Sequence, residues 1–352
     1  MKSFINFGKN ILVSNYKRLP FPYKLTFAIT YWCNYRCKTC GIWKRKPQNE
    51  LSLDVITEFF RKSNKFNWID FTGGEIWLRE DFTEIVQASL LYCKKLMILH
   101  FPTNGYLTEK IVRGVKRIVE MRPPKLIITV SVDGDEALND QIRGKKGGWR
   151  KQIETYKRLY EIPHVEVFLG MTLSKFNWDQ YESAFEAAKK ECSWLKPTDF
   201  HMNIAHESAH FYGNTENDTL VKYKPLIREQ IERYKNHRGF HFNPVAYIER
   251  RYLKHVESYL DTEITPMRCQ AMTSSCFVDP WGNIYPCGMY DAKIANLRDY
   301  NFDLQKIWNL PQAIKLQKEI WEYVCPQCWT PCEAYQSILG NLLGLRNRPT
   351  GI

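Results

Sequence analysis

Three cysteines near the start of the chain have a spacing that can bind metal. Cys33, Cys37 and Cys40 form the pattern C-x3-C-x2-C in the segment TYWCNYRCKTCGIWK. Three thiolates are one fewer than a cubane iron–sulfur cluster or a structural zinc ion normally takes. A cluster held this way keeps one iron open for a substrate-like molecule, whereas zinc needs a fourth ligand from elsewhere. The spacing favours the cluster and leaves zinc as the alternative.

A second group of cysteines lies towards the other end of the chain. Some flank the segment CFVDPWGNIYPC and others follow in CPQCWTPC, and the group comprises Cys269, Cys276, Cys287, Cys325, Cys328 and Cys332. The chain has 11 cysteines in total, an odd number. No secretory signal is visible, and this context favours metal ligation over disulfides. We therefore predict a second metal centre here, and a zinc ribbon is the alternative to a cluster.

The composition is that of an ordinary globular protein, with 44% hydrophobic and 25% charged residues. The net charge of +12 favours an anionic partner, but the charge is spread out and nucleic-acid binding is disfavoured. No segment has the roughly 20 apolar residues that span a bilayer, so we expect a cytoplasmic protein. Apolar and basic residues alternate among the first fifteen positions. We expect this segment to be an amphipathic helix packed on the protein's own core, with a membrane surface as the less favoured alternative.

Strand-like and helix-like segments alternate over the first two thirds of the chain. Six apolar, β-rich segments are predicted as strands: 24–30, 68–73, 96–101, 125–133, 165–173 and 199–205. Apolar residues recur with helical spacing between them, as at Leu53, Ile56, Phe59 and Phe60. This alternation predicts parallel β/α units with right-handed crossovers. A partial six-unit barrel and an open α/β sheet both fit the pattern.

The composition changes sharply after this region. Two long charged helices are predicted within residues 216–262, and the chain from 263 onward is rich in Cys, Pro, Gly and Trp. We therefore predict four parts, namely an N-terminal segment 1–23, a barrel 24–215, a helical connection 216–262 and a small domain 263–352. The small domain is expected to need metal to stay folded.

The cysteine motif and three further segments together resemble the radical S-adenosylmethionine (SAM) superfamily. Thr72-Gly73-Gly74-Glu75 resembles its GGE motif, Pro102-Thr103-Asn104-Gly105 its TNG turn, and Ser131-Val132-Asp133-Gly134 its fourth-strand motif. Each is weak alone, but they occur in the right order at successive predicted strand ends. The resemblance covers residues 24 to 210 and implies a partial (β/α)6 barrel. It also implies a [4Fe–4S] cluster that binds SAM and cleaves it to a 5′-deoxyadenosyl radical.

The same resemblance implies a set of SAM contacts. Glu75 would accept a hydrogen bond from the SAM ammonium, and the neighbouring glycines would let the backbone approach closely. Arg143 falls in a predicted loop and would face the SAM carboxylate. The full implied set is Gly73, Gly74, Glu75, Asn104, Ser131, Asp133 and Arg143.

The C-terminal cysteines resemble those of the SPASM and twitch extensions found in this superfamily. Cys269, Gly282 and Cys287 fit C-x12-G-x4-C, and a C-x2-C pair follows. The resemblance assigns Cys269, Cys287, Cys325 and Cys328 to one auxiliary [4Fe–4S] cluster. Cys276 and Cys332 are either neighbours or substitutes for one of these ligands.

The resemblance implies an enzyme that abstracts hydrogen from an organic substrate, namely a small or sugar-like metabolite, a peptide or a lipid. It also implies a low-potential electron donor such as flavodoxin or ferredoxin. Only about 23 residues precede the first predicted strand, which disfavours a peptide because peptide-modifying members often carry an N-terminal recognition domain. The competing class is a non-catalytic iron–sulfur or zinc-binding protein. The roles of His201, His206 and His210, near the end of the sixth predicted strand, are left open.

Overall fold

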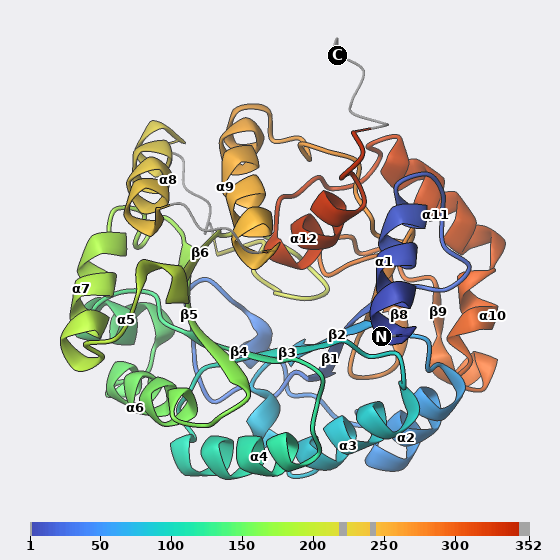
Figure 1. Ribbon diagram of the computed structural model, residues 1–352, viewed down its shortest axis with the longest axis horizontal. Helices are drawn as coiled ribbons and strands as arrows, with labels where there is room; N and C mark the ends of the chain where they lie inside the picture. Colours follow the sequence, from blue (N-terminus) through green and yellow to red (C-terminus); the bar gives the residue numbers. More distant parts are fainter. Residues whose placement is uncertain (1, 218–223, 240–243, 345–352) are drawn as a thin grey trace.

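A mixed sheet of nine strands organises the chain, of which the computed structural model describes residues 2–217, 224–239 and 244–344 (Figure 1). The strand order is β6-β5-β4-β3-β2-β1-β7-β8-β9, so the sheet has two free edges and does not close. The six N-terminal strands pair in parallel throughout. They are β1 (Lys24–Thr30), β2 (Trp68–Gly73), β3 (Ile98–Thr103), β4 (Leu126–Ser131), β5 (Val165–Leu173) and β6 (Phe200–Ile204).

The predicted partial barrel is confirmed as a parallel sheet with helices packed on its outer face (Figure 1). Three strands match their predicted bounds, and β3 lies two residues further along the chain than expected. The outer helices are α2 (Leu53–Lys62), α3 (Phe82–Tyr92), α4 (Thr108–Glu120), α6 (Gly148–Tyr160) and α7 (Tyr181–Glu191), and the short α5 (Glu136–Arg143) precedes α6.

Side chains along β1 point alternately towards the outer helices and towards the inside of the partial barrel. Phe27 packs on Phe59 and Phe60 of α2, with ring centroids 5.7 and 6.3 Å apart. Lys24 and Thr26 point the other way, because side chains alternate along a strand. The inner side of the sheet is therefore unusually polar, and it surrounds the space within the partial barrel.

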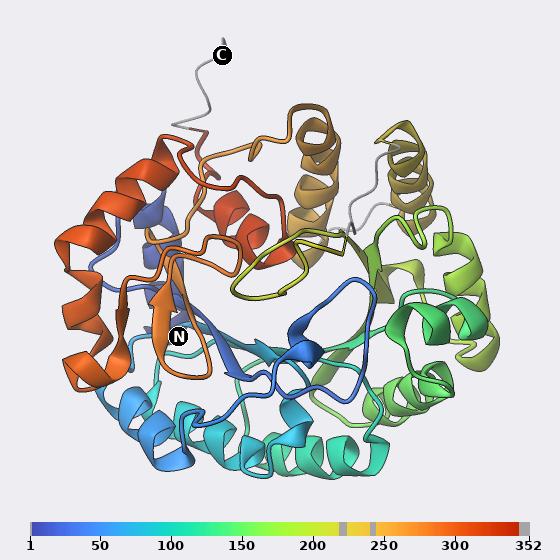
Figure 2. The same cartoon turned by 180° about the vertical axis from the view of Figure 1, so that it is seen from behind.

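The C-terminal hairpin is part of the main sheet. β7 (Ser275–Val278) pairs in parallel with β1, and β8 (Asn283–Tyr285) and β9 (Ala295–Asn296) continue outward in antiparallel fashion. One buried apolar cluster also contains both Phe27 and Trp308. The boundary at residue 263 stays a prediction, but the sheet and the core both cross it (Figure 2).

The remaining helices surround the hairpin and the open side of the sheet. They are α1 (Lys2–Ser14), α8 (Lys224–Arg238), α9 (Pro244–Thr262), α10 (Leu304–Trp308), α11 (Pro311–Trp321) and α12 (Pro331–Leu339). The two long charged helices predicted within 216–262 correspond to α8 and α9, although residues 218–223 and 240–243 lie outside the described residues. None of the helices among the described residues has the length and apolar character to cross a membrane.

Four short 3₁₀ helices complete the secondary structure. They are η1 (Ile42–Lys44), η2 (Ile76–Leu78), η3 (Pro197–Asp199) and η4 (Leu297–Tyr300). Two of them, η1 and η2, directly follow the cysteine motif and the GGE motif. They therefore redirect the chain immediately after the residues that the sequence singled out.

Candidate functional site

The three N-terminal cysteines lie in the loop that follows β1, at the carboxyl end of the parallel strands. Burial raises the pKa of Cys33 to about 11 and that of Cys40 to about 12, and it raises the pKa of Cys37 as well. Because thiolate is the form that binds metal, positive charge from iron is needed to deprotonate these side chains. Cys37 influences the pKa of Cys33, and both Cys37 and Cys33 influence the pKa of Cys40, which places the three side chains near one another.

Backbone hydrogen bonds fix this loop to α5. The Arg36 amide donates to the Arg143 carbonyl over 3.2 Å, and the Lys38 amide donates to the Ile142 carbonyl over 2.8 Å. The end of α5 therefore holds the stretch of loop between Cys33 and Cys40. This contact joins residues that are about one hundred positions apart in the sequence.

The loop after β6 holds the other end of the cysteine motif. The Gly41 amide donates to the Tyr212 carbonyl over 2.8 Å, and the Asn214 side chain donates to the Thr39 carbonyl over 3.0 Å. Figure 2 shows these two loops, one blue and one olive, on the same side of the sheet. The cysteine motif is thus held from both flanks.

The two glycines of the GGE motif allow β2 to end directly against the start of the cysteine loop. A Cβ on Gly73 would lie 2.0 Å from the Thr30 carbonyl oxygen, and one on Gly74 would lie 2.1 Å from that of Trp32. Gly73 also has φ +130°, which L-residues rarely adopt. These glycines therefore serve packing within the chain, in addition to the close approach to SAM implied by the resemblance.

Glu75 is a buried carboxylate surrounded by hydrogen-bond donors. One oxygen accepts from the Thr103 hydroxyl over 2.8 Å, and the other accepts from the Asn104 amide over 2.7 Å. Burial raises the pKa of Glu75 to about 7, although these donors and Arg143 act in the opposite direction. A positively charged group placed beside this carboxylate would therefore be strongly attracted to it.

The predicted residues at the ends of β3 and β4 differ in their surroundings. The Asn104 side chain donates to Oδ1 of Asn34 over 2.7 Å, so it contacts the cysteine loop directly. Ser131 ends β4, is partly exposed, and uses its carbonyl to accept from the Gln152 side chain over 2.8 Å. Asn104 is thus integrated into the site, whereas the Ser131 hydroxyl stays a predicted contact.

The loop position expected for Arg143 is wrong. Arg143 is the last residue of α5 and is only 8% exposed, with Nη1 bound to Oδ2 of Asp133 over 2.6 Å. Burial alone would lower the pKa of Arg143, but nearby Cys37 and Asp133 hold it above its usual value. The sequence did not predict this buried, helical position, because the glycines at 144, 147 and 148 suggested a longer loop. Asp133 therefore positions Arg143 next to the cysteines.

Polar atoms without partners show that this region fits a polar ligand. Nε of Arg143 and the hydroxyl of Tyr35 are buried and make no hydrogen bond among the described residues. The Arg143 guanidinium carbon also lies 5.4 Å from the centre of the Tyr35 ring. Three thiols, a buried carboxylate and a buried guanidinium together suit an iron–sulfur cluster with bound SAM, whose amino acid moiety carries both charges.

Four of the C-terminal cysteines converge. Cys325 and Cys328 act electrostatically on the pKa of the Cys269 thiol, and Cys269 and Cys328 act on that of the Cys287 thiol. The four side chains therefore lie near one another. Among the described residues, no three metal-binding side chains are close enough to share a single ion. A four-iron cluster keeps its ligands further apart than zinc does, because each thiolate binds a different iron. The arrangement therefore fits the auxiliary cluster predicted from the resemblance.

The other two C-terminal cysteines have different electrostatic neighbours. Among the cysteines and acidic groups described, only Glu333 shifts the pKa of the Cys276 thiol. The pKa of the Cys332 thiol is shifted by Lys24, Asp70 and Glu333. We propose that neither is a cluster ligand. Cys332 is solvent-accessible even though burial raises its pKa to about 11.

Two of the three histidines whose roles the sequence left open connect the loop after β6 to the C-terminal cysteines. The Trp329 amide, next to Cys328, donates to Nε2 of His206 over 3.0 Å, and Nδ1 of His206 lies 3.0 Å from the Ile204 carbonyl oxygen. Nε2 of His210 lies 3.0 Å from the Cys287 carbonyl oxygen. These contacts position the auxiliary site relative to the loop that holds Cys40.

His201 has a different environment inside the partial barrel. Its ring stacks on Phe168 with centroids 4.2 Å apart, and its Nε2 is buried without a hydrogen-bond partner among the described residues. Burial lowers the pKa of His201, so the ring is neutral near pH 7. This nitrogen is available to a ligand within the barrel.

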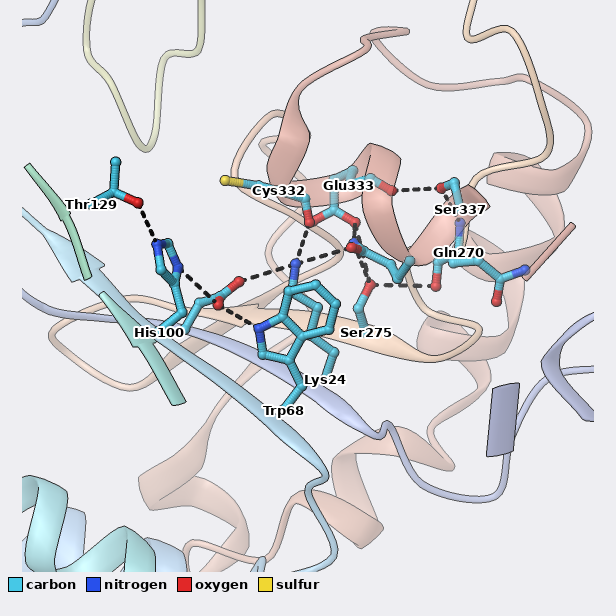
Figure 3. Close-up of polar contacts among 11 residues, drawn as sticks. Lys24, Trp68, His100, Thr129, Gln270, Ser275, Cys332, Glu333 and Ser337 are labelled. Atoms are coloured by element: carbon cyan, nitrogen blue, oxygen red, sulfur yellow. Dashed lines mark hydrogen bonds and ion pairs between the residues drawn. The ribbon is translucent and has the colours of Figure 1, made fainter. Parts of the chain in front are cut away.

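A polar network lines the inner side of the sheet (Figure 3). Lys24 is fully buried and pairs with Asp70 over 3.1 Å, and Asp70 in turn lies 3.2 Å from Nδ1 of His100. Nε2 of His100 lies 3.1 Å from the Thr129 hydroxyl. The network joins four neighbouring strands, β1 to β4, to α12, because Lys24 also donates to the Cys332 carbonyl over 2.5 Å.

Replacing Asp70 by asparagine is expected to destabilise the fold by about 3–5 kcal/mol, because buried Lys24 would lose its ion-paired carboxylate and, among acidic residues, keep only the electrostatic influence of Glu333. Thermal and denaturant unfolding measure this loss. Glu58→Gln is the matched control, since Glu58 forms ion pairs with Arg61 and Lys62 on the surface and such pairs contribute little. A double variant that also carries Lys24→Met should recover part of the loss, and no recovery would contradict the pairing.

The same pair predicts a dependence of stability on pH. Burial alone would raise the pKa of Asp70, but Lys24 and His100 lower it to about 2. A carboxylate with a depressed pKa stabilises the fold above its unfolded pKa near 4 and loses this contribution as the pH falls towards 2. The wild type should therefore lose more stability between pH 4 and pH 2 than Asp70→Asn does, as measured by urea unfolding across that range.

Comparisons with known proteins agree with this geometry. The family model described as the radical SAM superfamily matches residues 27–188, and the SPASM model, described as an iron–sulfur cluster-binding domain, matches residues 269–329. The first range begins within β1 and contains the cysteine loop and the GGE motif. The second contains the four converging cysteines.

Several curated proteins are similar over most of the chain. Mycofactocin maturase MftC of Mycolicibacterium smegmatis is 27% identical over 352 residues, covering 95% of this chain and 82% of the relative. The antilisterial bacteriocin subtilosin biosynthesis protein AlbA of Bacillus subtilis is 22% identical over 342 residues, covering 92% of this chain. This chain spans 66% of the length of AlbA and 62% of that of SkfB, the sporulation killing factor maturation protein of the same organism.

Solved structures show the same fold. Streptococcus suis SuiB bound to S-adenosylmethionine has a TM-score of 0.59 at 18% identity, covering 90% of this chain and 71% of SuiB. The protein anSMEcpe, with AdoMet and a Cp18Cys peptide bound, has a TM-score of 0.60 at 16% identity, covering 92% of this chain and 98% of that chain.

The fold and the cysteine loop are those of a SAM-dependent iron–sulfur protein. The chain belongs to the radical SAM superfamily and carries an iron–sulfur cluster-binding SPASM domain. Its cofactors are SAM and [4Fe–4S] clusters. The competing hypothesis of a non-catalytic binding protein is therefore set aside.

Proposed function

We propose that this chain cleaves SAM reductively and abstracts a hydrogen atom from a residue of a peptide substrate. The observation that carries the first part is the convergence of four chain segments on the cysteine loop. These segments are the GGE turn, the turn at Asn104, the end of α5 and the loop after β6. When bound, the cluster and SAM supply a 5′-deoxyadenosyl radical.

The chain's own residues would bind and orient SAM. Cys33, Cys37 and Cys40 would hold the cluster, and Glu75 would accept a hydrogen bond from the SAM ammonium. Arg143, held by Asp133, would donate to the SAM carboxylate through its unpaired Nε. The sheet and its helices would keep the reacting groups away from bulk water. A low-potential donor such as flavodoxin or ferredoxin would provide the electron.

A peptide is the substrate class that the comparisons support. Two relatives are named as maturases or maturation proteins, and AlbA is named for the biosynthesis of a bacteriocin. Among the structures of the same fold, SuiB also has a form bound to the precursor peptide SuiA, with a TM-score of 0.59 at 18% identity. The sequence disfavoured a peptide only because the segment before the first strand is short. It does not outweigh these relatives.

Replacing Glu75 by glutamine is expected to weaken SAM binding about tenfold, because the neutral amide loses its attraction to the ammonium. The cluster should remain, since Glu75 is not a ligand. Isothermal titration of SAM into the anaerobically reconstituted protein measures the affinity, and an iron assay measures the cluster.

Glu80→Gln is the matched control for this experiment. Glu80 lies five residues further along the chain, its side chain is 91% exposed, and it pairs with Lys110 on the surface. This variant should bind SAM as the wild type does. Unchanged SAM affinity in Glu75→Gln would refute the role of Glu75.

Deuterium transfer tests the substrate class. Candidate peptides would be made with fully deuterated side chains and Cα positions, and incubated with SAM, dithionite and the reconstituted protein. A peptide substrate should transfer deuterium to 5′-deoxyadenosine and lose mass accordingly. Cleavage of SAM that is stimulated by sugar alcohols or lipids, and by no peptide, would overturn the peptide assignment while preserving the assignment to radical SAM chemistry.

A further inference from the structure

Helix α1 presents an apolar face to solvent. Phe4, Ile5 and Leu12 are 71%, 60% and 51% exposed. At 100° per residue these three positions fall on one side of the helix, together with Gly8, which has no neighbour within 4 Å. The prediction that α1 packs its apolar residues on the protein's own core is therefore only partly correct. Large exposed apolar side chains that cluster in this way usually mark an interaction site.

The opposite face of α1 is fixed to the protein. Asn10 donates from Nδ2 to Oδ1 of Asn67 over 2.9 Å, and the rings of Phe7 and Tyr23 meet edge to face with centroids 5.4 Å apart. These contacts set the rotation of the helix about its axis. The helix cannot turn Phe4, Ile5 and Leu12 inward without breaking them.

The C-terminal end of α1 adds further apolar side chains to this surface. Asn15, which directly follows the helix, donates to the Leu339 carbonyl over 3.1 Å and accepts from the Leu343 amide over 3.2 Å. Leu342 and Leu343 are themselves exposed, as is Tyr16. Figure 1 shows α1 beside the last described residues of the chain.

The charged residues within α1 are all basic. Residues 1–49 contain no Asp or Glu, and Lys9 and Lys17 are exposed. Lys94 and Lys95 are also exposed, and the Ser3 hydroxyl donates to the Lys94 carbonyl over 3.4 Å, which places that turn beside the start of α1. An apolar strip bordered by lysines suits a surface that is apolar within and negatively charged outside.

We propose that the α1 surface, defined as Phe4, Ile5, Leu12, Tyr16, Leu342 and Leu343 with the neighbouring lysines, docks on a lipid bilayer that contains anionic phospholipids. The apolar side chains would enter the boundary between headgroups and acyl chains, and Lys9, Lys17, Lys94 and Lys95 would contact the headgroups. This is attachment along the membrane surface, and none of the helices in the described part of the chain would cross the bilayer.

A second copy of the chain fits this surface less well. In a two-fold dimer the same patch meets itself, so the lysines that border it would face one another. Like charges across an interface are unfavourable, and α1 contributes no acidic residue to compensate them. The complementary surface must therefore be negative, as an anionic bilayer is. This proposal does not depend on the proposed substrate.

Flotation with lipid vesicles tests the proposal on the full, reconstituted chain. The vesicles would contain phosphatidylcholine alone, or phosphatidylcholine with about one third phosphatidylglycerol. The wild type should bind the anionic vesicles and release from them as the salt concentration rises, because salt screens the lysines. Phe4→Ser, Ile5→Ser and Leu12→Ser combined should lower the partition coefficient about tenfold.

Two further variants separate membrane docking from a general loss of structure. Tyr160→Ser removes an exposed aromatic side chain at the end of α6, away from α1, and should bind vesicles as the wild type does. Lys9→Glu with Lys17→Glu keeps the apolar residues, and it should weaken binding to anionic vesicles with unchanged thermal unfolding. Equal vesicle binding by the wild type and the triple serine variant would overturn the proposal. The proposal would also be overturned if the wild type bound no vesicles and light scattering showed a wild-type dimer that the triple serine variant does not form.

Discussion

Alanine at Cys33, Cys37 or Cys40 is expected to reduce SAM cleavage to the level of a protein-free control. The three thiols lie together in the loop after β1, and with one removed the chain has only two ligands for the cluster. Without the cluster no electron reaches SAM. The measurement is 5′-deoxyadenosine formed under anaerobic conditions with dithionite as the reductant.

A buried cysteine outside both groups provides the control for this result. Cys93 follows α3 and lies within the apolar core. Cys93→Ala should retain cleavage and full iron, apart from a modest loss of stability from the small cavity. Each loop variant should also lose about four irons per chain and keep the auxiliary cluster. Retained SAM cleavage in any of the three loop variants would contradict the assignment of the cluster to this loop.

The second large effect is expected at the C-terminal cysteines. Cys325→Ala combined with Cys328→Ala should lower the iron content by about four per chain, because two of the four converging ligands are lost. The first cluster should survive, since its ligands come from a separate loop. Iron, sulfide and zinc assays on the reconstituted protein distinguish a cluster from a zinc site.

The remaining C-terminal cysteines provide a matched comparison. Cys276→Ser and Cys332→Ser should each keep the wild-type iron content, because none of the four converging thiols is among the groups that shift their pKa values. Loss of about four irons in either variant would show that it is a ligand after all. An unchanged iron content in the Cys325 and Cys328 double variant, with zinc present, would instead support the zinc ribbon.

Local patterns in the sequence determined much of the fold. The strands at 24–30, 68–73 and 165–173 were predicted to the residue, because apolar β-rich segments bounded by turn residues depend on neighbours in the chain. The cysteine spacing and the order of the short motifs also identified the family, which the family models confirm.

Contacts between distant segments could not be predicted in this way. The pairing of β7 with β1 joins residues about 250 positions apart, so the periodicity of either segment carries no information about it. The environment of Arg143 includes Asp133 after β4 and Tyr35 and Cys37 in the cysteine loop, two parts of the chain about one hundred residues apart. Its local sequence, rich in glycine, suggested only a loop.

The sequence by itself therefore determined the chemistry and the order of the elements. Residue types and spacings are properties of short segments, and thiolate ligands, turn glycines and strand periodicity can be recognised there. Only the tertiary structure showed that the four C-terminal cysteines assigned by the resemblance converge, why Lys24 can be buried, and that α1 leaves its apolar face uncovered. Each of these depends on which distant side chains share a small volume, and that is settled by packing of the whole chain.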